Sequence, residues 1–211
     1  MDIFIEEILA DIEWRVSELA TIKSMPIKYN FRPDHKKLQI KYSVPALYAI
    51  WEGFVKSTFT IYSQHLNSIN ISRNNIALSL LTHHIDSECN FTNPRTGFES
   101  KKRLVKLIDD ILNDTISIKP NVPTESNVNF KVVNQILERF CISTIPDFYE
   151  QGLNKLLKFR NMIAHGENAL SVNMTHLVEF ASLIENLMLD IVINVEECAK
   201  IQTYFNNEEV A

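Results

Sequence analysis

Three polar side chains near position 160 have types and a spacing suited to acid–base chemistry on a phosphate. They are Arg160, Asn161 and His165, and Gly166 follows them directly. Histidine is the side chain whose ordinary pKa lies closest to neutrality, so it can take or deliver a proton. Arginine offers a planar fork of N–H donors that fits the non-bridging oxygens of a phosphate. Asparagine can add a neutral hydrogen bond to the same group.

The spacing of these residues requires a particular local structure. Five residues of regular α-helix turn by about 140° beyond one full turn, so Arg160 and His165 share a side only where the helix ends or distorts. Gly166 predicts such an end. Lys155 and Lys158 add positive charge nearby. A group that titrates near neutrality beside a fixed cation is what RNA cleavage through its own 2′-hydroxyl requires. The residues alone leave an alternative open, a cluster that only caps the end of a helix.

A second notable segment, residues 44–56, reads VPALYAIWEGFVK. Its carboxylate, Glu52, could pair with Arg160 and orient it, or could be an ordinary solvated helix position. The aromatic residues of this segment favour a place in the core over a platform for stacking bases. These aromatic residues are Tyr48, Trp51 and Phe54.

Three separated places in the sequence resemble the HEPN superfamily. The first is its RxxxxH motif, present as Arg160-Asn161-x3-His165. The second is residues 48–56, similar to the aromatic-Trp-Glu-Gly-Phe-Val-Lys helix of HEPN-like nucleases from prokaryotic defence and toxin loci. The third is the stretch 127–130, Asn-Val-Asn-Phe, which precedes the motif. The three occur in the expected order, and the resemblance covers most of the chain.

This resemblance implies an all-α, HEPN-type helical bundle and a metal-independent endoribonuclease that needs no cofactor. It implies a homodimer with one composite site, RNA as substrate, and a 2′,3′-cyclic phosphate product. It further implies a toxin or defence effector with an antitoxin or regulatory partner protein. The expected catalytic residues are Arg160, Asn161 and His165, and the expected supporting or RNA-binding residues are Glu52, Lys155 and Lys158. The alternative is a non-cleaving HEPN module that binds RNA or a partner protein as a scaffold.

Charge and composition narrow the possible functions. Of the 211 residues, 21 are basic and 26 acidic, for a formal net charge of −5, and only 4 are glycine. The glycines lie too far apart for a phosphate-binding loop or a dinucleotide fingerprint. Such an acidic chain does not carry a wide basic coat, although a local basic site is compatible with it. The run Lys101-Lys102-Arg103 could guide RNA or form a solvated helix face. His83 and His84 lack the i, i+4 spacing of a helical zinc site, so no metal site is predicted.

Apolar periodicity predicts a single all-α domain over residues 1–211, a helical bundle with irregular insertions. No apolar stretch is long enough to cross a membrane, and an acidic start is unlike a signal peptide, so we expect a cytoplasmic protein. Residues 38–42 alternate in polarity and are read as an extended connector. Helices are expected over residues 2–25, from Pro45 to 66, and over 74–84, 101–112, 127–140, 147–166 and 175–205.

Overall fold

The computed structural model describes residues 2–89, 97–113, 116–120, 127–167 and 171–206. In these ranges the chain forms α-helices and no β-strand, which confirms the all-α prediction; one isolated bridge joins Ile76 to Phe205. The helices are α1 (Ile3–Lys28), α2 (Pro33–Ile69), α3 (Leu78–Cys89), α4 (Phe98–Asn113), α5 (Phe130–Arg139), α6 (Tyr149–Ala164) and α7 (Met174–Ile201), with a short 3-10 turn at Arg73–Asn75. None of the helices in these ranges combines the length and apolar content that crossing a membrane requires.

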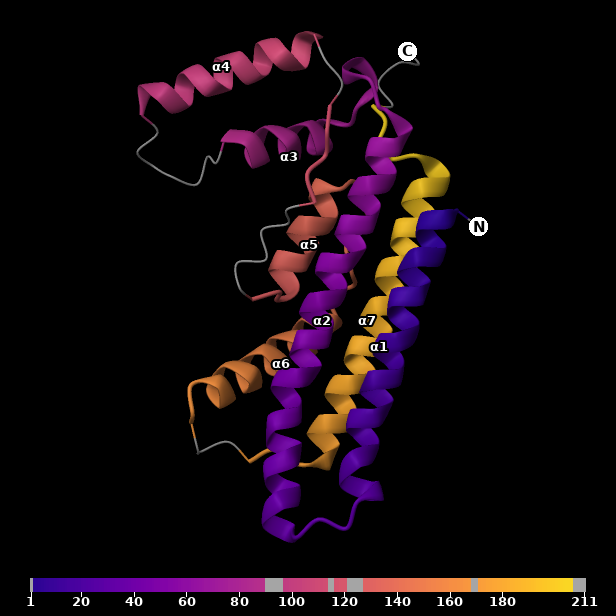
Figure 1. The fold of residues 1–211 in the computed structure, drawn as a ribbon, viewed down its shortest axis with the longest axis vertical. Coiled ribbons are helices and arrows are strands. Elements are labelled where there is room, and N and C mark those ends of the chain that lie inside the picture. The colour runs from indigo at the N-terminus through magenta and orange to yellow at the C-terminus, as the bar shows by residue number, and fades with distance from the viewer. Residues whose placement is uncertain (1, 90–96, 114–115, 121–126, 168–170, 207–211) are drawn as a thin grey trace.

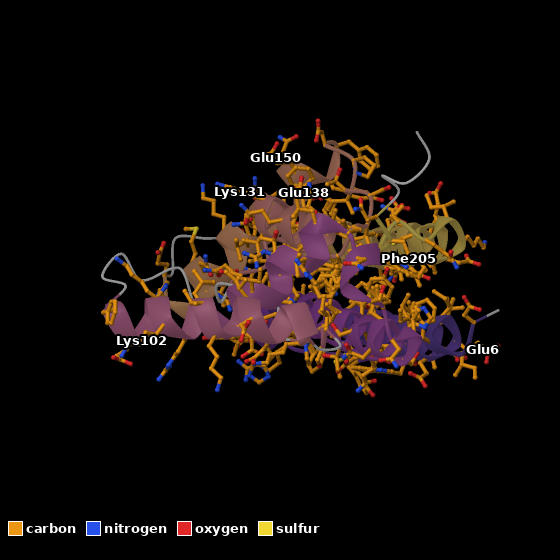
Figure 2. The ribbon with its side chains drawn as sticks, turned by 90° about the horizontal axis from the view of Figure 1, so that it is seen from above. Glu6, Lys102, Lys131, Glu138, Glu150 and Phe205 are labelled. Carbon is orange, nitrogen blue, oxygen red and sulfur yellow. The ribbon has the colours of Figure 1, made fainter. Side chains whose placement is uncertain are left out.

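Three long helices, α1, α2 and α7, run side by side and form the body of the molecule (Figure 1). Helix α6 packs against α2 and α7, and α5 packs between α3 and α6. Helix α4 packs on α3 and reaches away from the long helices. Seen from above, α4 with Lys102 and α1 with Glu6 lie at opposite sides of the molecule (Figure 2). Helix α2 is therefore the central element, and it contacts the helix that carries the RxxxxH motif.

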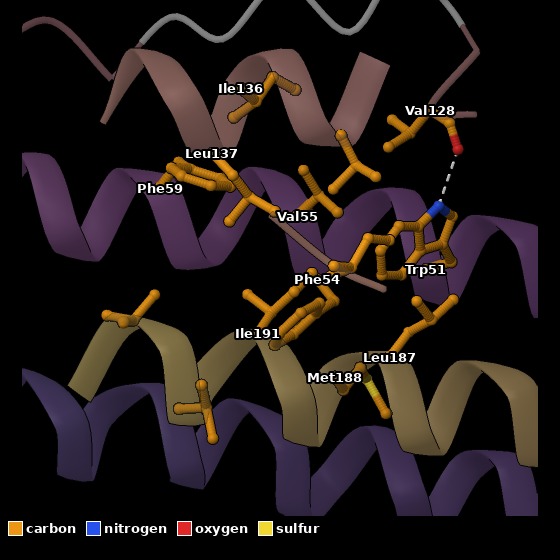
Figure 3. Close-up of a cluster of buried hydrophobic side chains, with 14 of the residues drawn as sticks. Trp51, Phe54, Val55, Phe59, Val128, Ile136, Leu137, Leu187, Met188 and Ile191 are labelled. Atoms are coloured by element: carbon orange, nitrogen blue, oxygen red, sulfur yellow. Dashed lines mark hydrogen bonds between the residues drawn. The ribbon is translucent and has the colours of Figure 1, made fainter. Parts of the chain in front are cut away.

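The core is built around the aromatic side chains of α2. Trp51 and Phe54 are fully buried and pack toward α7 and α5 (Figure 3). Tyr48 is buried as well, so the prediction that these aromatic residues belong to the core is confirmed. Their neighbours in the core include Val55, Phe59, Ile136, Leu137, Leu187, Met188 and Ile191. Burial of this much apolar surface is the main force that holds the helices together.

Helix α2 is longer than its prolines suggested. It begins at Pro33 and continues through Pro45, so the prediction of an extended connector over residues 38–42 was wrong. Pro33 occupies the start of the helix, where its missing N–H has no partner to lose. Burial at helical spacing outweighs the one hydrogen bond that Pro45 removes. The buried residues that show this spacing are Ile40, Val44 and Leu47. Helix α1 likewise continues through the buried Pro26, before which it was expected to end.

Gly53, within the segment that resembles HEPN nucleases, makes room for a buried arginine. A Cβ atom at position 53 would lie 2.8 Å from Nη1 of Arg15. Arg15 is only 6% exposed, and its guanidinium is paired with Asp11 at 2.7 Å and donates to the carbonyl of Ile50 at 3.0 Å. Because these bonds fix the guanidinium, the glycine allows α1 and α2 to approach closely.

We expect Gly53→Ala to lower the free energy of unfolding by about 1–3 kcal/mol, because the added methyl group displaces Arg15. In an Arg15→Ala background the same change should instead stabilise by up to about 1 kcal/mol, the helix preference for alanine over glycine. Urea unfolding of the wild type, the two single variants and the double variant measures both values. An equal effect in both backgrounds would show that Arg15 is not the reason for the glycine.

Candidate active site

Helix α6 ends where the sequence predicted, at the turn that holds His165. Gly166 has φ +75° and donates its N–H to the carbonyl of Ile163 at 3.1 Å. The N–H of Glu167 bonds to the carbonyl of Met162 at 2.9 Å. These two bonds form a Schellman motif, with His165 as the C-cap and glycine in the left-handed conformation that favours it. The predicted helix stop is confirmed, and it leaves the imidazole exposed.

The guanidinium of Arg160 is held in place by three neighbours. Its Nη1 donates to Oδ1 of Asn161 at 2.7 Å and to Oδ1 of Asn127 at 3.1 Å. Its Cζ lies 4.5 Å from the centre of the Tyr48 ring, a cation–π distance. Nε and Nη2 have no acceptor within the described part of the chain. One edge of the guanidinium is thus fixed by neutral amides, and the other edge is available for a phosphate.

Asn127 is one of the residues of the candidate site that the sequence reasoning missed. It was expected to begin the helix over residues 127–140, but that helix is capped by Asn129, whose Oδ1 accepts from the N–H of Val132 at 2.9 Å. Asn127 is therefore free to bind Arg160. The signal that could have found it was the match of the stretch 127–130 to HEPN nucleases, since only Asn129 is needed to start the helix.

Two buried aromatic side chains of α2 position the segment that carries Asn127. The hydroxyl of Tyr48 accepts from the N–H of Val128 at 2.7 Å, and Nε1 of Trp51 donates to the carbonyl of Val128 at 2.9 Å (Figure 3). Burial raises the pKa of Tyr48, although the bond from Val128 lowers it in part. The tyrosine is therefore a neutral phenol at ordinary pH. Helix α2 thus contributes to the site through the backbone of its neighbour.

Glu52 does not pair with Arg160, which was one of the two possibilities that the sequence left open for it. Its Oε1 lies 2.8 Å from Nζ of Lys56, one turn further along α2. The i, i+4 spacing on the same helix makes that pairing easily formed, whereas Arg160 takes its acceptors from neutral amides. Glu52 still acts on the site at longer range, since its negative charge contributes to the raised pKa of Tyr48.

The two predicted supporting lysines have different surroundings. Lys155 lies 2.9 Å from Oε2 of Glu179 on α7, and this bond lowers the pKa of the glutamate. Lys155 therefore links α6 to α7 in this structure. Lys158 is exposed and has no ion-pair or hydrogen-bond partner in the described ranges. Of the two lysines, Lys158 is the one whose charge is uncommitted.

A further cation reaches the turn of His165 from α2. Nζ of Lys41 donates to the carbonyl of Glu167 at 3.1 Å. The sequence reasoning missed this residue because it read residues 38–42 as a connector, away from any site. The end of α6 therefore carries an exposed imidazole, with Lys41 bonded to the turn that follows it and with Arg160 and Lys158 on the preceding turns of the same helix. Because α6 stays helical through Ala164, Arg160 and His165 leave the helix in different directions, about 140° apart. Cations and a group that can carry a proton, on one exposed helix end, suit chemistry on a polyanion.

The neighbouring histidines of α3 have structural contacts. Both are buried; Nε2 of His83 bonds to the carbonyl of Lys119 at 3.0 Å, and Nδ1 of His84 to that of Ser117 at 2.9 Å. Asp86 pairs with Arg139 of α5 at 2.7 Å. These contacts hold α3 against residues 116–120 and α5. In the ranges that the structure describes, no three His, Cys, Asp or Glu side chains are grouped so as to hold a metal ion.

We expect the stability of the protein to fall as the pH drops below about 6.5, in part because of His83. Burial lowers the pKa of His83 in the folded state, so the unfolded chain takes up the proton first. The contribution of His83 to stability is complete above the pKa that its ring has in the unfolded chain. It is lost as the pH falls toward the lower pKa that the ring has in the folded protein. Because the carbonyl of Lys119 can only accept a hydrogen bond, Nε2 of His83 carries the hydrogen of the neutral ring. Nδ1 of His83 is buried and has no hydrogen-bond partner among the described residues, so a second proton there would have no acceptor.

Thermal unfolding of the wild type and of His83→Gln at pH 7.5 and pH 5.5 checks this expectation. Glutamine keeps an N–H donor near Nε2 but does not titrate, so its Tm should fall less between the two pH values. His65, whose pKa is also lowered by burial, still contributes in both proteins. An identical fall in Tm for the two proteins would contradict the role of His83.

In a comparison with known families, a family model described as MAE_28990-like HEPN matches residues 4–204, a range that includes all the side chains of the candidate site. No curated protein and no solved structure matches the chain.

Proposed function

The chain belongs to the HEPN family, and from that premise we propose that it is a metal-independent endoribonuclease that cuts RNA through the 2′-hydroxyl. The observation that carries the proposal is the state of Arg160. Its guanidinium is fixed by Asn127 and Asn161, yet keeps one edge without an acceptor in the described part of the chain, five residues before the exposed His165. A helix cap would need no such fixed arginine.

In the proposed reaction the 2′-oxygen attacks the adjacent phosphorus, and the bond from phosphorus to the 5′-oxygen breaks. The free edge of Arg160 binds the non-bridging oxygens, where negative charge builds up in the transition state. His165 takes the proton of the 2′-hydroxyl or delivers one to the leaving 5′-oxygen. The products are a 2′,3′-cyclic phosphate and a 5′-hydroxyl end. DNA lacks the nucleophile and should not be cut.

We propose that two protomers form one composite site. In a single chain His165 is exposed, so water surrounds the imidazole. A second copy facing the same turn would exclude that water and supply a second histidine, so that one copy can accept a proton while the other donates one. It would also double the cationic side chains around the phosphate. This arrangement would create a local basic cleft in a chain whose formal net charge is −5.

The biological role we propose is that of a toxin or defence effector. Unrestrained cleavage of RNA harms the cell that makes the enzyme, so an antitoxin or another regulatory partner protein is part of the proposal.

The experiment that tests the proposed activity uses the purified full chain and a single-stranded RNA in excess chelator. We expect cleavage to continue in chelator and to stop when the nucleotide at the cut carries a 2′-deoxy sugar. The fragments should carry cyclic phosphate ends. Loss of activity in chelator would contradict metal independence, and cutting at the 2′-deoxy position would exclude the proposed nucleophile. Binding of RNA with no cleavage under any of these conditions would favour a scaffold.

A further inference from the structure

A groove of about 840 Å³ lies next to the turn that holds His165. Its walls are the first two turns of α2, from Pro33 to Lys41, and residues 171–174 at the start of α7. Lys41 belongs to both features, because it lines the groove and its Nζ donates to the carbonyl of Glu167. Lys41 therefore connects the groove to the turn that follows His165.

The charged side chains of this groove are mostly positive. Lys36, Lys37 and Lys41 line it, and Asp34 is the carboxylate among its described lining residues. That carboxylate lies 3.5 Å from Nε of Arg32, but both side chains are exposed, so the pair is weak and Asp34 offsets part of the charge of the lysines. Lys36 and Lys37 have no ion-pair or hydrogen-bond partner in the described part of the chain. Lys37 and Lys41 are one helical turn apart, about 6 Å along the axis of α2. The groove thus presents three lysines, and the side chains of Lys36 and Lys37 have no acceptor in the described part of the chain.

The backbone adds to this positive potential. Two long helices start at the groove, α2 at Pro33 and α7 at Met174, near the same end of the bundle (Figure 1). The N-terminal end of an α-helix carries a partial positive charge. Asn173 caps α7 by accepting from the N–H of His176 at 3.0 Å, which uses only one of the free N–H groups of the first turn. These dipoles strengthen the field of the lysines and do not define the site alone.

We propose that this groove, which we call the lysine groove, binds the phosphates of single-stranded RNA beside the cleaved bond. The inference rests on the proposed function, since it takes RNA as the ligand. The groove fits a single strand because three lysines in a confined channel match a few consecutive phosphates, whereas a duplex needs a wider basic surface. Apolar side chains of the lining, among them the exposed Leu38 and the half-buried Val172, provide surface for the sugars and bases. The lysine groove thereby holds the strand that enters or leaves the site.

The test measures RNA binding in a chain that cannot cleave. The His165→Ala protein is titrated into a fluorescent single-stranded RNA, and anisotropy is read at two salt concentrations. We expect Lys36→Gln/Lys37→Gln/Lys41→Gln to weaken binding by about 10–100-fold, and to flatten the plot of log K against log salt by about 2, or about 0.7 per lost phosphate contact.

Two further variants separate the groove from other effects. Lys36→Gln/Lys37→Gln removes no side-chain hydrogen bond or ion pair among the described residues, so it tests the groove without breaking the bond from Lys41 to the turn of His165, and should weaken binding by about 3–10-fold. The matched control, Lys101→Gln/Lys102→Gln/Arg103→Gln, removes the same number of charges from α4. Binding of the control should stay within about twofold of the parent.

Each outcome decides the inference. Equal weakening by the groove and α4 variants would reduce the effect to net charge and overturn it, as would a parent chain that binds no RNA. If RNA binding is weakened in the groove variants and not in the α4 control, the inference on the lysine groove is supported. This holds even if the chain with an intact His165 cuts no RNA, in which case only the proposed activity fails. Conversely, suppose that the groove variants with an intact His165 cleave RNA as fast as the wild type at an RNA concentration below saturation. That result would overturn the inference on the lysine groove and leave the proposed activity intact.

Discussion

Replacing His165 with alanine lowers the rate of RNA cleavage by about 10²–10⁴-fold and leaves the Tm unchanged. The rate effect is the usual contribution of a group that transfers a proton in the transition state. The stability is unaffected because the imidazole is exposed and the helix end is held by backbone bonds of Gly166 and Glu167. Single-turnover cleavage of a labelled RNA and a thermal melt of the same preparation measure the two quantities.

The matched control is Glu167→Ala, in the same exposed turn. Its carboxylate has no partner in the described ranges, while its N–H and carbonyl, which do have partners, are kept by alanine. Cleavage by this variant should stay within about threefold of the wild type, since only a rim charge is removed. A His165→Ala protein that cuts RNA at the wild-type rate would remove the histidine from the mechanism, whatever the control shows.

Replacing Trp51 with alanine should lower the free energy of unfolding by about 3–5 kcal/mol, the largest effect on stability that we expect from one substitution. The indole is 0% exposed and packs at the centre of α2. Its removal leaves a cavity and also frees the carbonyl of Val128, to which Nε1 donates at 2.9 Å. Urea unfolding, followed by circular dichroism at 222 nm, gives the free energy.

Trp51→Phe separates packing from hydrogen bonding. Phenylalanine keeps an aromatic ring in the core but cannot donate to Val128, so we expect a smaller loss of about 1–3 kcal/mol, the cost of an unsatisfied buried carbonyl. Because Val128 adjoins Asn127, this variant should also cleave RNA more slowly at a temperature where it is fully folded. A Trp51→Phe protein with wild-type stability and activity would show that the indole only fills space.

These predictions connect parts of the chain that are far apart in sequence. Tyr48 lies under the guanidinium of Arg160, and it shares with Trp51 the backbone of Val128. The segment that resembles HEPN nucleases in α2 is therefore a support for the site. Its Gly53 has a separate role in the contact between α1 and α2.

Much of the candidate site could be predicted from the sequence, because a helix and its end depend on residues that are close together in the chain. Gly166 five residues after Asn161 predicted a helix end at His165, since a glycine with positive φ closes a helix through bonds to the preceding turn. Apolar periodicity predicted the helices in the same way, because each face repeats over a few residues. The resemblance at three segments predicted the family.

Tertiary structure decided the contacts between distant segments. The polarity pattern of residues 38–42 read locally as a connector, yet α2 continues through them because Ile40 and Val44 are buried against other helices, which outweighs the hydrogen bond lost at Pro45. That continuity brings Lys41 to the turn of His165.

The partners of Arg160 were decided in the same way. Glu52 pairs with Lys56, one turn away on its own helix, whereas one of the two acceptors of Arg160 is Asn127, 33 residues earlier in the chain. No periodicity encodes such a pairing, because it depends on how α2 holds the backbone of Val128. The sequence by itself thus determined the helices, the helix end at His165 and the family. The packing of α2 against its neighbours decided which side chains hold the arginine and where the lysine groove lies, since those positions follow from burial summed over the whole bundle.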